Sequence, residues 1–256
     1  MRKRDWMTSA LSVLLLGSML AFPAMAQEAR KVILNEDPWP PYTLGEEGQP
    51  PTGGIAVDVI QEVFKRLRVP VELWLYPWKR CLFLVKDGAH DGHMLLLKTP
   101  EWEEYMLFSV PFIPDRYLFW YRADRPQPIE WQDFADLKAY KIGLTTDYSY
   151  GDEFPAMVKT HHLLVDYARS DELNFKRLLA GRIDVFLCME NVANMLFKLR
   201  PEFQGQFKAA AKPLMQLEMY MAISKTSNAA ALLPEINRVI LEMQADGTLE
   251  RLVKGN

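Results

Sequence analysis

Hydrophobic residues recur along this chain at two spacings, one typical of helices and one typical of buried strands. From residue 55 to residue 67, apolar side chains return every three or four positions, which predicts a helix with one buried face. The same spacing predicts helices at residues 133–139, 191–199, 234–245 and 249–254. Continuous or alternating apolar runs predict strands at residues 31–35, 71–76, 117–121, 141–144 and 214–223.

A helix–glycine–strand pattern occurs twice in the chain. In the first copy, a helical run at residues 78–86 is followed by Gly88 and an apolar run that ends at Leu97. In the second copy, a helical run at residues 172–180 is followed by Gly181 and an apolar run. Glycine is favoured after a helix because that position usually has a left-handed backbone. Two such units predict two similar α/β lobes with a cleft between them.

The first 26 residues have the pattern of a secretory signal peptide. A basic start with Arg2, Lys3 and Arg4 precedes an apolar stretch at residues 10–22, and Ala24-Met25-Ala26 matches a cleavage site. The apolar stretch is short for a bilayer-spanning helix, which needs roughly 20 apolar residues. We therefore expect residues 1–26 to be removed, and a periplasmic protein to begin at Gln27.

Charge and cysteine usage narrow the classes of partner and cofactor. The net charge is −3 and no basic cluster follows the signal segment, so nucleic acid is not expected as a partner. Cys81 and Cys188 lie in corresponding halves of the repeated pattern, so we expect two separate buried thiols rather than a disulfide. His90 and His93 would face opposite sides of an extended chain, and we expect no metal or cofactor.

Two loops are candidates for ligand contact. Three prolines stiffen the loop after the first strand, which carries Trp39 and Tyr42. A stiff loop at the end of a parallel strand can hold an aromatic ring toward a ligand, although the two rings could instead fill a gap in the core. The polar loop at residues 145–151, with Tyr148 and Ser149, precedes a predicted helix. Its free backbone N–H groups suit an anionic group of a ligand.

The order of the elements predicts two lobes between which the chain crosses twice. Residues 27–121 and 215–256 are assigned to lobe 1, and residues 122–214 to lobe 2. The polar, proline-containing segment at residues 122–128 is the expected first crossing, and the strand at residues 214–223 is the expected return. Two crossings of this kind form a hinge about which the lobes can close on a ligand.

In the order and spacing of its short motifs, the chain resembles the periplasmic solute-binding proteins of family 3, the amino-acid type that serves ABC importers. The motifs are Pro38-Trp39-Pro40-Pro41-Tyr42, Gly54 with Asp58, residues 78–91, Thr99-Pro100-Glu101 with Phe108-Ser109-Val110-Pro111, residues 137–143, residues 179–184 and Asp246-Gly247-Thr248-Leu249. The resemblance spans nearly the whole mature chain. It implies an α/β, two-lobed periplasmic binding protein fold like type II, with two crossing strands as the hinge.

The resemblance also implies roles for individual residues. Aromatic residues of lobe 1 sandwich the ligand in this family, and the matching Trp39 and Trp78 suit a flat or cationic ligand. The polar loop that holds a carboxylate matches residues 147–149. An acidic residue that often pairs with the ligand's amino group falls at Met189 or Glu190, and Glu190 is the only carboxylate of the two. The alternative is that Glu190 is a solvated glutamate at a helix start.

The chain departs from the family where an amino acid would be held by its α-carboxylate. Family members place an arginine after the segment that matches residues 99–101, and the residue here is Trp102. The preceding strand end, usually small and polar, is Leu95-Leu96-Leu97-Lys98. Arg80 and Lys98 are candidates to replace the missing charge, and a surface position for either is an equally good interpretation. The ligand is then a non-standard amino acid, another small organic ion or a less polar solute.

These features predict a monomeric binding protein without catalytic activity, which captures a small polar, amino-acid-like solute. ABC permease subunits or a membrane sensor are its expected partners. Two alternatives stay open. Exported dehydratases that act on cyclohexadienyl acids resemble this family, and Glu190 could be their acid, but their carboxylate substrates should require the arginine that Trp102 replaces. The second alternative is an orphan receptor that signals to a membrane sensor by protein contact. The sequence features do not distinguish this role from transport.

Overall fold

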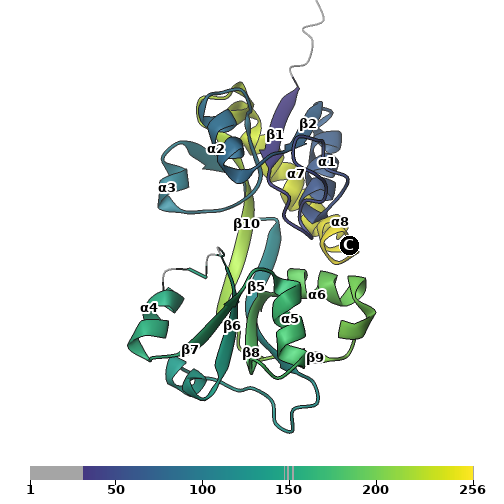
Figure 1. The fold of residues 1–256 in the computed structure, drawn as a ribbon. Helices are drawn as coiled ribbons and strands as arrows, with labels where there is room; N and C mark the ends of the chain where they lie inside the picture. Colours follow the sequence, from purple (N-terminus) through teal and green to yellow (C-terminus); the bar gives the residue numbers. More distant parts are fainter. Residues whose placement is uncertain (1–30, 147, 149, 152, 256) are drawn as a thin grey trace, which may run out of the picture.

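The chain folds into two lobes joined by two long strands. The computed structural model describes residues 31–146, 148, 150–151 and 153–255, with only the backbone of residue 255. The predicted signal peptide and Ser149 lie outside the described residues. Figure 1 shows β5 (Ile113–Arg122) and β10 (Met215–Ser224) running from one lobe to the other. The predicted α/β fold with two lobes and two crossing strands is confirmed.

Lobe 1 is built on a parallel sheet in which β1 lies between β2 and β3. The strands are β1 (Val32–Glu36), β2 (Val71–Leu75), β3 (Gly92–Leu97) and the short antiparallel β4 (Met106–Phe108). The helices are α1 (Ile55–Leu67), α2 (Trp78–Lys86), α3 (Pro100–Glu103), the 3-10 helix η3 (Asn228–Leu232), α7 (Leu233–Ala245) and α8 (Thr248–Gly255). Helix α1 packs against α7 and α8, so the C-terminal helices belong to lobe 1.

Lobe 2 repeats this arrangement, with β6 between β7 and β8 in a second parallel sheet. Its strands are β6 (Lys141–Thr145), β7 (Leu164–Ala168), β8 (Val185–Met189) and the short β9 (Phe207–Ala209). Its helices are the 3-10 helix η1 (Phe134–Ala139), α4 (Glu153–Thr160), α5 (Asp171–Leu179), α6 (Glu190–Leu199) and the 3-10 helix η2 (Pro201–Phe203).

The crossing itself is made by hydrogen-bonded strand rather than by a loop. From Ile113 to Tyr117, β5 pairs with β10, and from Tyr117 to Trp120 it pairs with β8 of lobe 2. The structure therefore puts the first crossing before Tyr117, whereas the polar segment at residues 122–128 follows the end of β5 within lobe 2. A polar, proline-containing segment has the composition of a linker, but an apolar strand with partners on both sides can span two lobes. Which residues move with each lobe stays a prediction.

The repeated pattern found in the sequence corresponds to equivalent units in the two lobes. After α2, Gly88 has a φ of 80°, and after α5, Gly181 has a φ of 65°. Both values are in the left-handed region that favours glycine. Each unit ends in a buried strand, β3 in lobe 1 and β8 in lobe 2. Cys81 and Cys188 are buried and free, which confirms the prediction of two separate thiols.

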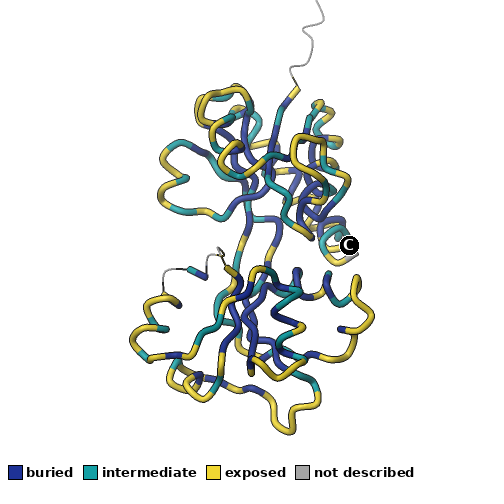
Figure 2. The backbone as a smooth tube through the Cα atoms, viewed as in Figure 1, coloured by how far each residue is buried: buried dark blue, intermediate teal, exposed yellow. Residues whose placement is uncertain are grey.

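Burial follows the strands and the inner faces of the helices. Figure 2 shows the buried segments inside each lobe and along the two crossing strands, with exposed segments around them. In α1, the buried positions include Val59, Ile60, Val63 and Phe64, which matches the helical spacing in the sequence. One buried hydrophobic cluster extends through both lobes along the crossing strands, so the two lobes are packed around a continuous core.

Candidate solute-binding cleft

A cavity of about 420 Å³ lies between the lobes, at the edge of the sheet where β1 and β3 end. Lobe 1 contributes Glu36, Asp37, Trp39, Trp78, Leu95, Leu96, Leu97, Thr99 and Trp102, and Tyr117, Tyr148, Met189 and Leu217 complete the lining. The carboxyl ends of parallel strands are the usual location of ligand sites in α/β folds. The lining is mostly aromatic and apolar, with a few polar groups, as expected for a small-molecule site.

Three tryptophans from separate segments of lobe 1 line this cavity. Trp39 is fixed by its backbone N–H, which donates to the Thr43 hydroxyl oxygen at 2.9 Å. Trp78 is the first residue of α2, and its ring centroid lies 5.9 Å from that of Trp102 at an angle of 79°. The N–H of Trp102 donates to the Thr99 hydroxyl at 3.3 Å, which caps α3. The predicted aromatic residues Trp39, Trp78 and Trp102 thus lie together.

A buried histidine supports the Trp78 ring from inside lobe 1. The ring centroids of Trp78 and His93 are 5.3 Å apart, and His93 is fully buried in β3. Burial lowers the pKa of His93 to about 3, so its imidazole is neutral at physiological pH. His93 therefore acts as packing for the wall of the cavity. Among the described residues, no group of three or more His, Cys, Asp or Glu side chains is placed to hold a metal ion.

Two adjacent carboxyl groups at the end of β1 form the acidic part of the cavity. Glu36 is buried, and its carboxylate accepts the backbone N–H of Leu95 at 3.1 Å. Burial, reinforced by the charge of Asp37, raises the pKa of Glu36 well above its usual value. Burial also raises the pKa of Asp37. Neither residue was predicted from the sequence as part of the site. The polar run Asn35-Glu36-Asp37 at the end of the first strand could have indicated them.

We expect Glu36→Gln to make the stability of the protein less dependent on pH. Because the pKa of Glu36 is higher in the folded state than in the unfolded state, its contribution to stability is present at acidic pH and is lost as pH rises through the folded-state pKa. Urea unfolding of the wild type should therefore show a larger loss of stability between about pH 4.5 and neutral pH than the variant shows. Glu202→Gln, at an exposed site, is the matched control. An equal loss in wild type and Glu36→Gln would contradict this assignment.

On the lobe 2 side, Tyr148 lines the cavity and is hydrogen-bonded to a buried carboxylate. The Tyr148 hydroxyl donates to one oxygen of Asp171 at 3.2 Å, and the Thr145 hydroxyl donates to the other at 2.5 Å. Burial raises the pKa of Asp171. The polar loop that was expected to hold an anionic group therefore includes side chains that donate to a carboxylate of the protein. Ser149, the other predicted residue of this loop, lies outside the described residues.

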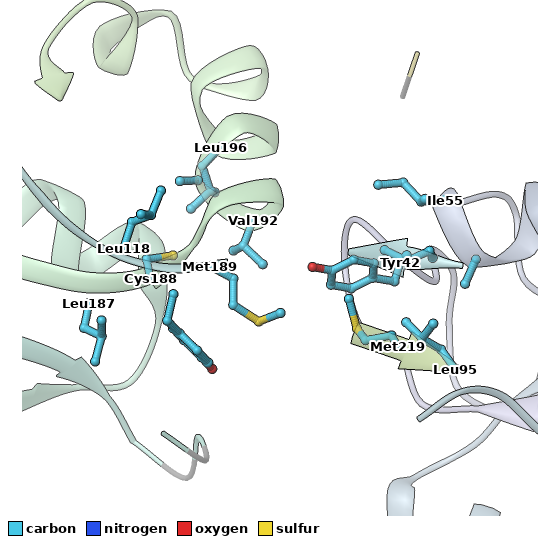
Figure 3. Close-up of a cluster of buried hydrophobic side chains, with 14 of the residues drawn as sticks. Tyr42, Ile55, Leu95, Leu118, Leu187, Cys188, Met189, Val192, Leu196 and Met219 are labelled. Carbon is cyan, nitrogen blue, oxygen red and sulfur yellow. The ribbon is translucent and has the colours of Figure 1, made fainter. Parts of the chain in front are cut away.

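Two of the predicted site residues form a hinge network instead of lining the cavity. Tyr42 is fully buried, and its hydroxyl donates to the Asp115 carboxylate in β5. Figure 3 shows the Tyr42 hydroxyl directed from lobe 1 toward the other lobe. Glu190 accepts two hydrogen bonds from the Arg116 guanidinium, at 2.6 and 2.8 Å. We call Tyr42, Asp115, Arg116 and Glu190 the hinge network, because they connect the two lobes beside the crossing strands.

Glu190 lines a different cavity, of about 500 Å³, between α6 and α8. Its neighbour Met189, the other candidate for the acidic position, lines the aromatic cavity. Consecutive side chains at a strand end point to opposite sides, so only one of the two can face the ligand. Glu190 is thus absent from the lining of the aromatic cavity, and its role as a ligand residue stays a prediction.

The two basic candidates also lie outside the lining of the aromatic cavity. The Arg80 guanidinium stacks 4.4 Å from the centre of the Tyr76 ring. The Lys98 ammonium forms an ion pair with Glu103 at 2.8 Å, and it lies 5.9 Å from the centre of the Phe108 ring. These contacts are with side chains on the outside of lobe 1, as the alternative interpretation of a surface position expected. A ligand role for either residue stays a prediction.

Comparison with known proteins decides the family of this chain. Residues 32–255 match the family described as bacterial extracellular solute-binding proteins, family 3. The chain belongs to this family. The resemblance seen in the motifs is thereby confirmed. Within the described residues, this family 3 protein has no helix with both the length and the apolar character needed to cross a bilayer.

Three proteins similar to this chain are named for binding a solute or substrate. The histidine-binding periplasmic protein of Salmonella typhimurium is 27% identical over 256 residues, which cover 96% of this chain and 95% of the relative. The second substrate binding domain of GlnP from Lactococcus lactis has a TM-score of 0.69 at 18% identity, over 87% of this chain and 92% of that domain. The L-cystine solute receptor of Neisseria gonorrhoeae has a TM-score of 0.68 at 21% identity, over 88% and 92%. The two structural comparisons show the fold alone.

Proposed function

We propose that this family 3 protein is a periplasmic receptor that captures a small, amino-acid-like organic solute between its lobes and delivers it to an ABC importer. The observation that carries the proposal is the aromatic cavity between two lobes joined by two strands. The relative from Salmonella typhimurium, named for histidine binding, supports the class of solute. A structural neighbour described as the substrate binding protein of an amino acid ABC transporter supports the importer.

Lobe closure is the expected mechanism of capture. Trp39, Trp78 and Trp102 come from lobe 1, while Tyr148 and Met189 come from lobe 2, so a solute that contacts both groups favours the closed arrangement. Small changes of backbone angle along β5 and β10 would be enough to bring the lobes together. Closure removes the solute and the tryptophan rings from water, which supplies the binding energy.

A role in binding is favoured over catalysis. The dehydratase hypothesis required Glu190 as the acid, and the Glu190 carboxylate is held by Arg116 beside the other cavity. The tryptophan in place of the family arginine also argues against a substrate with several carboxylates. We propose export through the signal peptide at residues 1–26 and a monomeric protein, with permease subunits or a membrane sensor as the partner.

The proposal is tested by thermal unfolding of the mature chain from Gln27, refolded from denaturant to remove any solute carried through purification. Amino acids, amines, polyamines, small carboxylates and short peptides are added in turn. A solute at 100 times its dissociation constant adds about 2.7 kcal/mol, which raises the melting temperature by several degrees. We expect one chemical class to give this shift. A well-folded protein whose melting temperature responds to no solute would contradict the proposal.

A further inference from the structure

We infer that the aromatic cavity selects an organic cation without a carboxylate group: an amine, a guanidine or a quaternary ammonium compound with an apolar body. This inference rests on the proposed function and names the class of solute at the same site. It follows from the charges of the lining, from its aromatic rings and from the position of the basic side chains around it.

The charged residues of the lining are all acidic. Glu36 and Asp37 line the cavity, and no lysine, arginine or histidine is among its described lining residues. Two basic side chains of neighbouring segments have other partners, since Lys98 pairs with Glu103 and Arg116 pairs with Glu190. A carboxylate in this cavity would meet two carboxyl groups and no cationic donor, which disfavours it. A cation there would favour the ionised form of these two carboxyl groups and would be attracted to it, because an opposite charge nearby offsets the effect of their burial.

The aromatic rings favour a cation for a second reason. Trp39, Trp78 and Trp102 line the cavity with Tyr117 and Tyr148, so five aromatic rings surround one space. The faces of aromatic rings carry partial negative charge, and tryptophan attracts cations most strongly. Quaternary ammonium groups are recognised by such arrangements of rings, because their charge is spread over methyl groups that also pack against carbon.

The lobe 2 side of the cavity offers a carboxylate next to its lining, but no hydrogen-bond donor that is free for an anionic ligand group among its described lining residues. The Tyr148 hydroxyl donates to the carboxylate of Asp171, which is buried. The remaining apolar side chains on this side are Met189 of lobe 2 and Leu217 of the crossing strand β10. Met189 is one of the two positions, with Glu190, at which the family resemblance implies an acidic residue for the ligand's amino group, and Glu190 is not in this lining. The cation is therefore held through lobe 1, by the carboxyl groups and the indole rings.

The inference is tested with pairs of compounds that differ in one group. Tryptamine and tryptophan, histamine and histidine, and agmatine and arginine each differ by the α-carboxylate. Choline and 3,3-dimethylbutan-1-ol differ by the positive charge. Calorimetric titration of the mature protein should show that an amine binds about tenfold or more tightly than its parent amino acid, or that choline binds about tenfold or more tightly than the neutral alcohol.

The outcomes separate this inference from the proposed function. If an amino acid binds as tightly as its amine in every pair that binds, or if only neutral or anionic solutes bind, the inference is overturned while the proposed function stands. If neither these probes nor the wider panel bind to the folded protein, both fail.

Variants of the acidic pair give a second test. Asp37→Asn should weaken binding of the best cation by about tenfold and change binding of neutral compounds little. Glu36→Gln serves the same purpose if Asp37→Asn does not fold. Glu72→Gln, a lobe 1 carboxylate on the exposed side of β2 that pairs with Lys31, is the matched control and should bind as the wild type does. Unchanged cation affinity in both cavity variants would overturn the inference.

Discussion

Asp115→Ala is expected to lower the free energy of unfolding by about 3 kcal/mol or more, because it leaves one buried and three partly buried donors without an acceptor. Asp115 is only 4% exposed, and one of its oxygens accepts the backbone N–H groups of Arg116, Glu190 and Asn191 at 2.6, 3.1 and 3.3 Å. The other oxygen accepts the Tyr42 hydroxyl. The carboxylate also stands at the N-terminus of α6, where the helix dipole stabilises a negative charge.

Urea unfolding of the mature protein measures this loss. Asp115→Asn, which keeps the shape and one acceptor oxygen, should lose less than Asp115→Ala. Tyr42→Phe, which removes a single hydrogen bond, should lose about 1 kcal/mol. If Asp115→Ala loses no more than Tyr42→Phe, the hinge network does not stabilise the fold as described.

The hinge network also explains why Tyr42 and Glu190 lie outside the lining of the aromatic cavity. Tyr42 comes from the loop after β1, and Glu190 is the first residue of α6 in lobe 2. Asp115 accepts the Tyr42 hydroxyl, and the adjacent Arg116 of β5 donates to the Glu190 carboxylate. These polar contacts connect side chains of the two lobes to β5, the strand that crosses between them.

Trp78→Ala is expected to weaken solute binding by about 10- to 100-fold while the protein stays folded, because one aromatic contact contributes about 1–3 kcal/mol to binding. Trp78 lines the cavity and is partly exposed, so its loss exposes no large core. The measurement is the dissociation constant of the solute that gives the largest thermal shift. Trp39→Ala should act in the same direction.

Trp74→Ala is the matched control for this prediction. Trp74 is a partly exposed tryptophan of lobe 1 that stacks on Tyr76, with ring centroids 6.2 Å apart, and it is not part of the cavity lining. Its loss should leave the dissociation constant within about twofold of the wild-type value. If Trp78→Ala and Trp39→Ala both bind like Trp74→Ala, the aromatic cavity is not the binding site.

Amphipathic helices and apolar strands could be predicted from the sequence because their patterns are local. The bounds of α1 and α2 agree with the predicted residues 55–67 and 78–86. β7 was not predicted, because it lies at the edge of the sheet and exposes Leu164 and Tyr167, so its burial pattern does not alternate clearly. The crossing was misplaced because composition cannot distinguish a hinge strand from a core strand.

The candidate site was predictable only in part, since it depends on which way each side chain points. Trp39, Trp78 and Trp102 were predicted from motif positions and do meet in one cavity. Glu190 was preferred over Met189 on chemistry, but its partner Arg116 lies 74 residues away in the sequence and is brought near only by the pairing of β5 with β8. Such long-range partners leave no local signal.

A crystal structure of the mature protein with its most stabilising solute tests the central claim most directly. The account predicts solute density between Trp39, Trp78 and Trp102 on one side and Tyr148 on the other, with the lobes closer together than in the free protein. Density in the other cavity, beside Glu190 and Asn191, with the aromatic cavity holding only water, would contradict it.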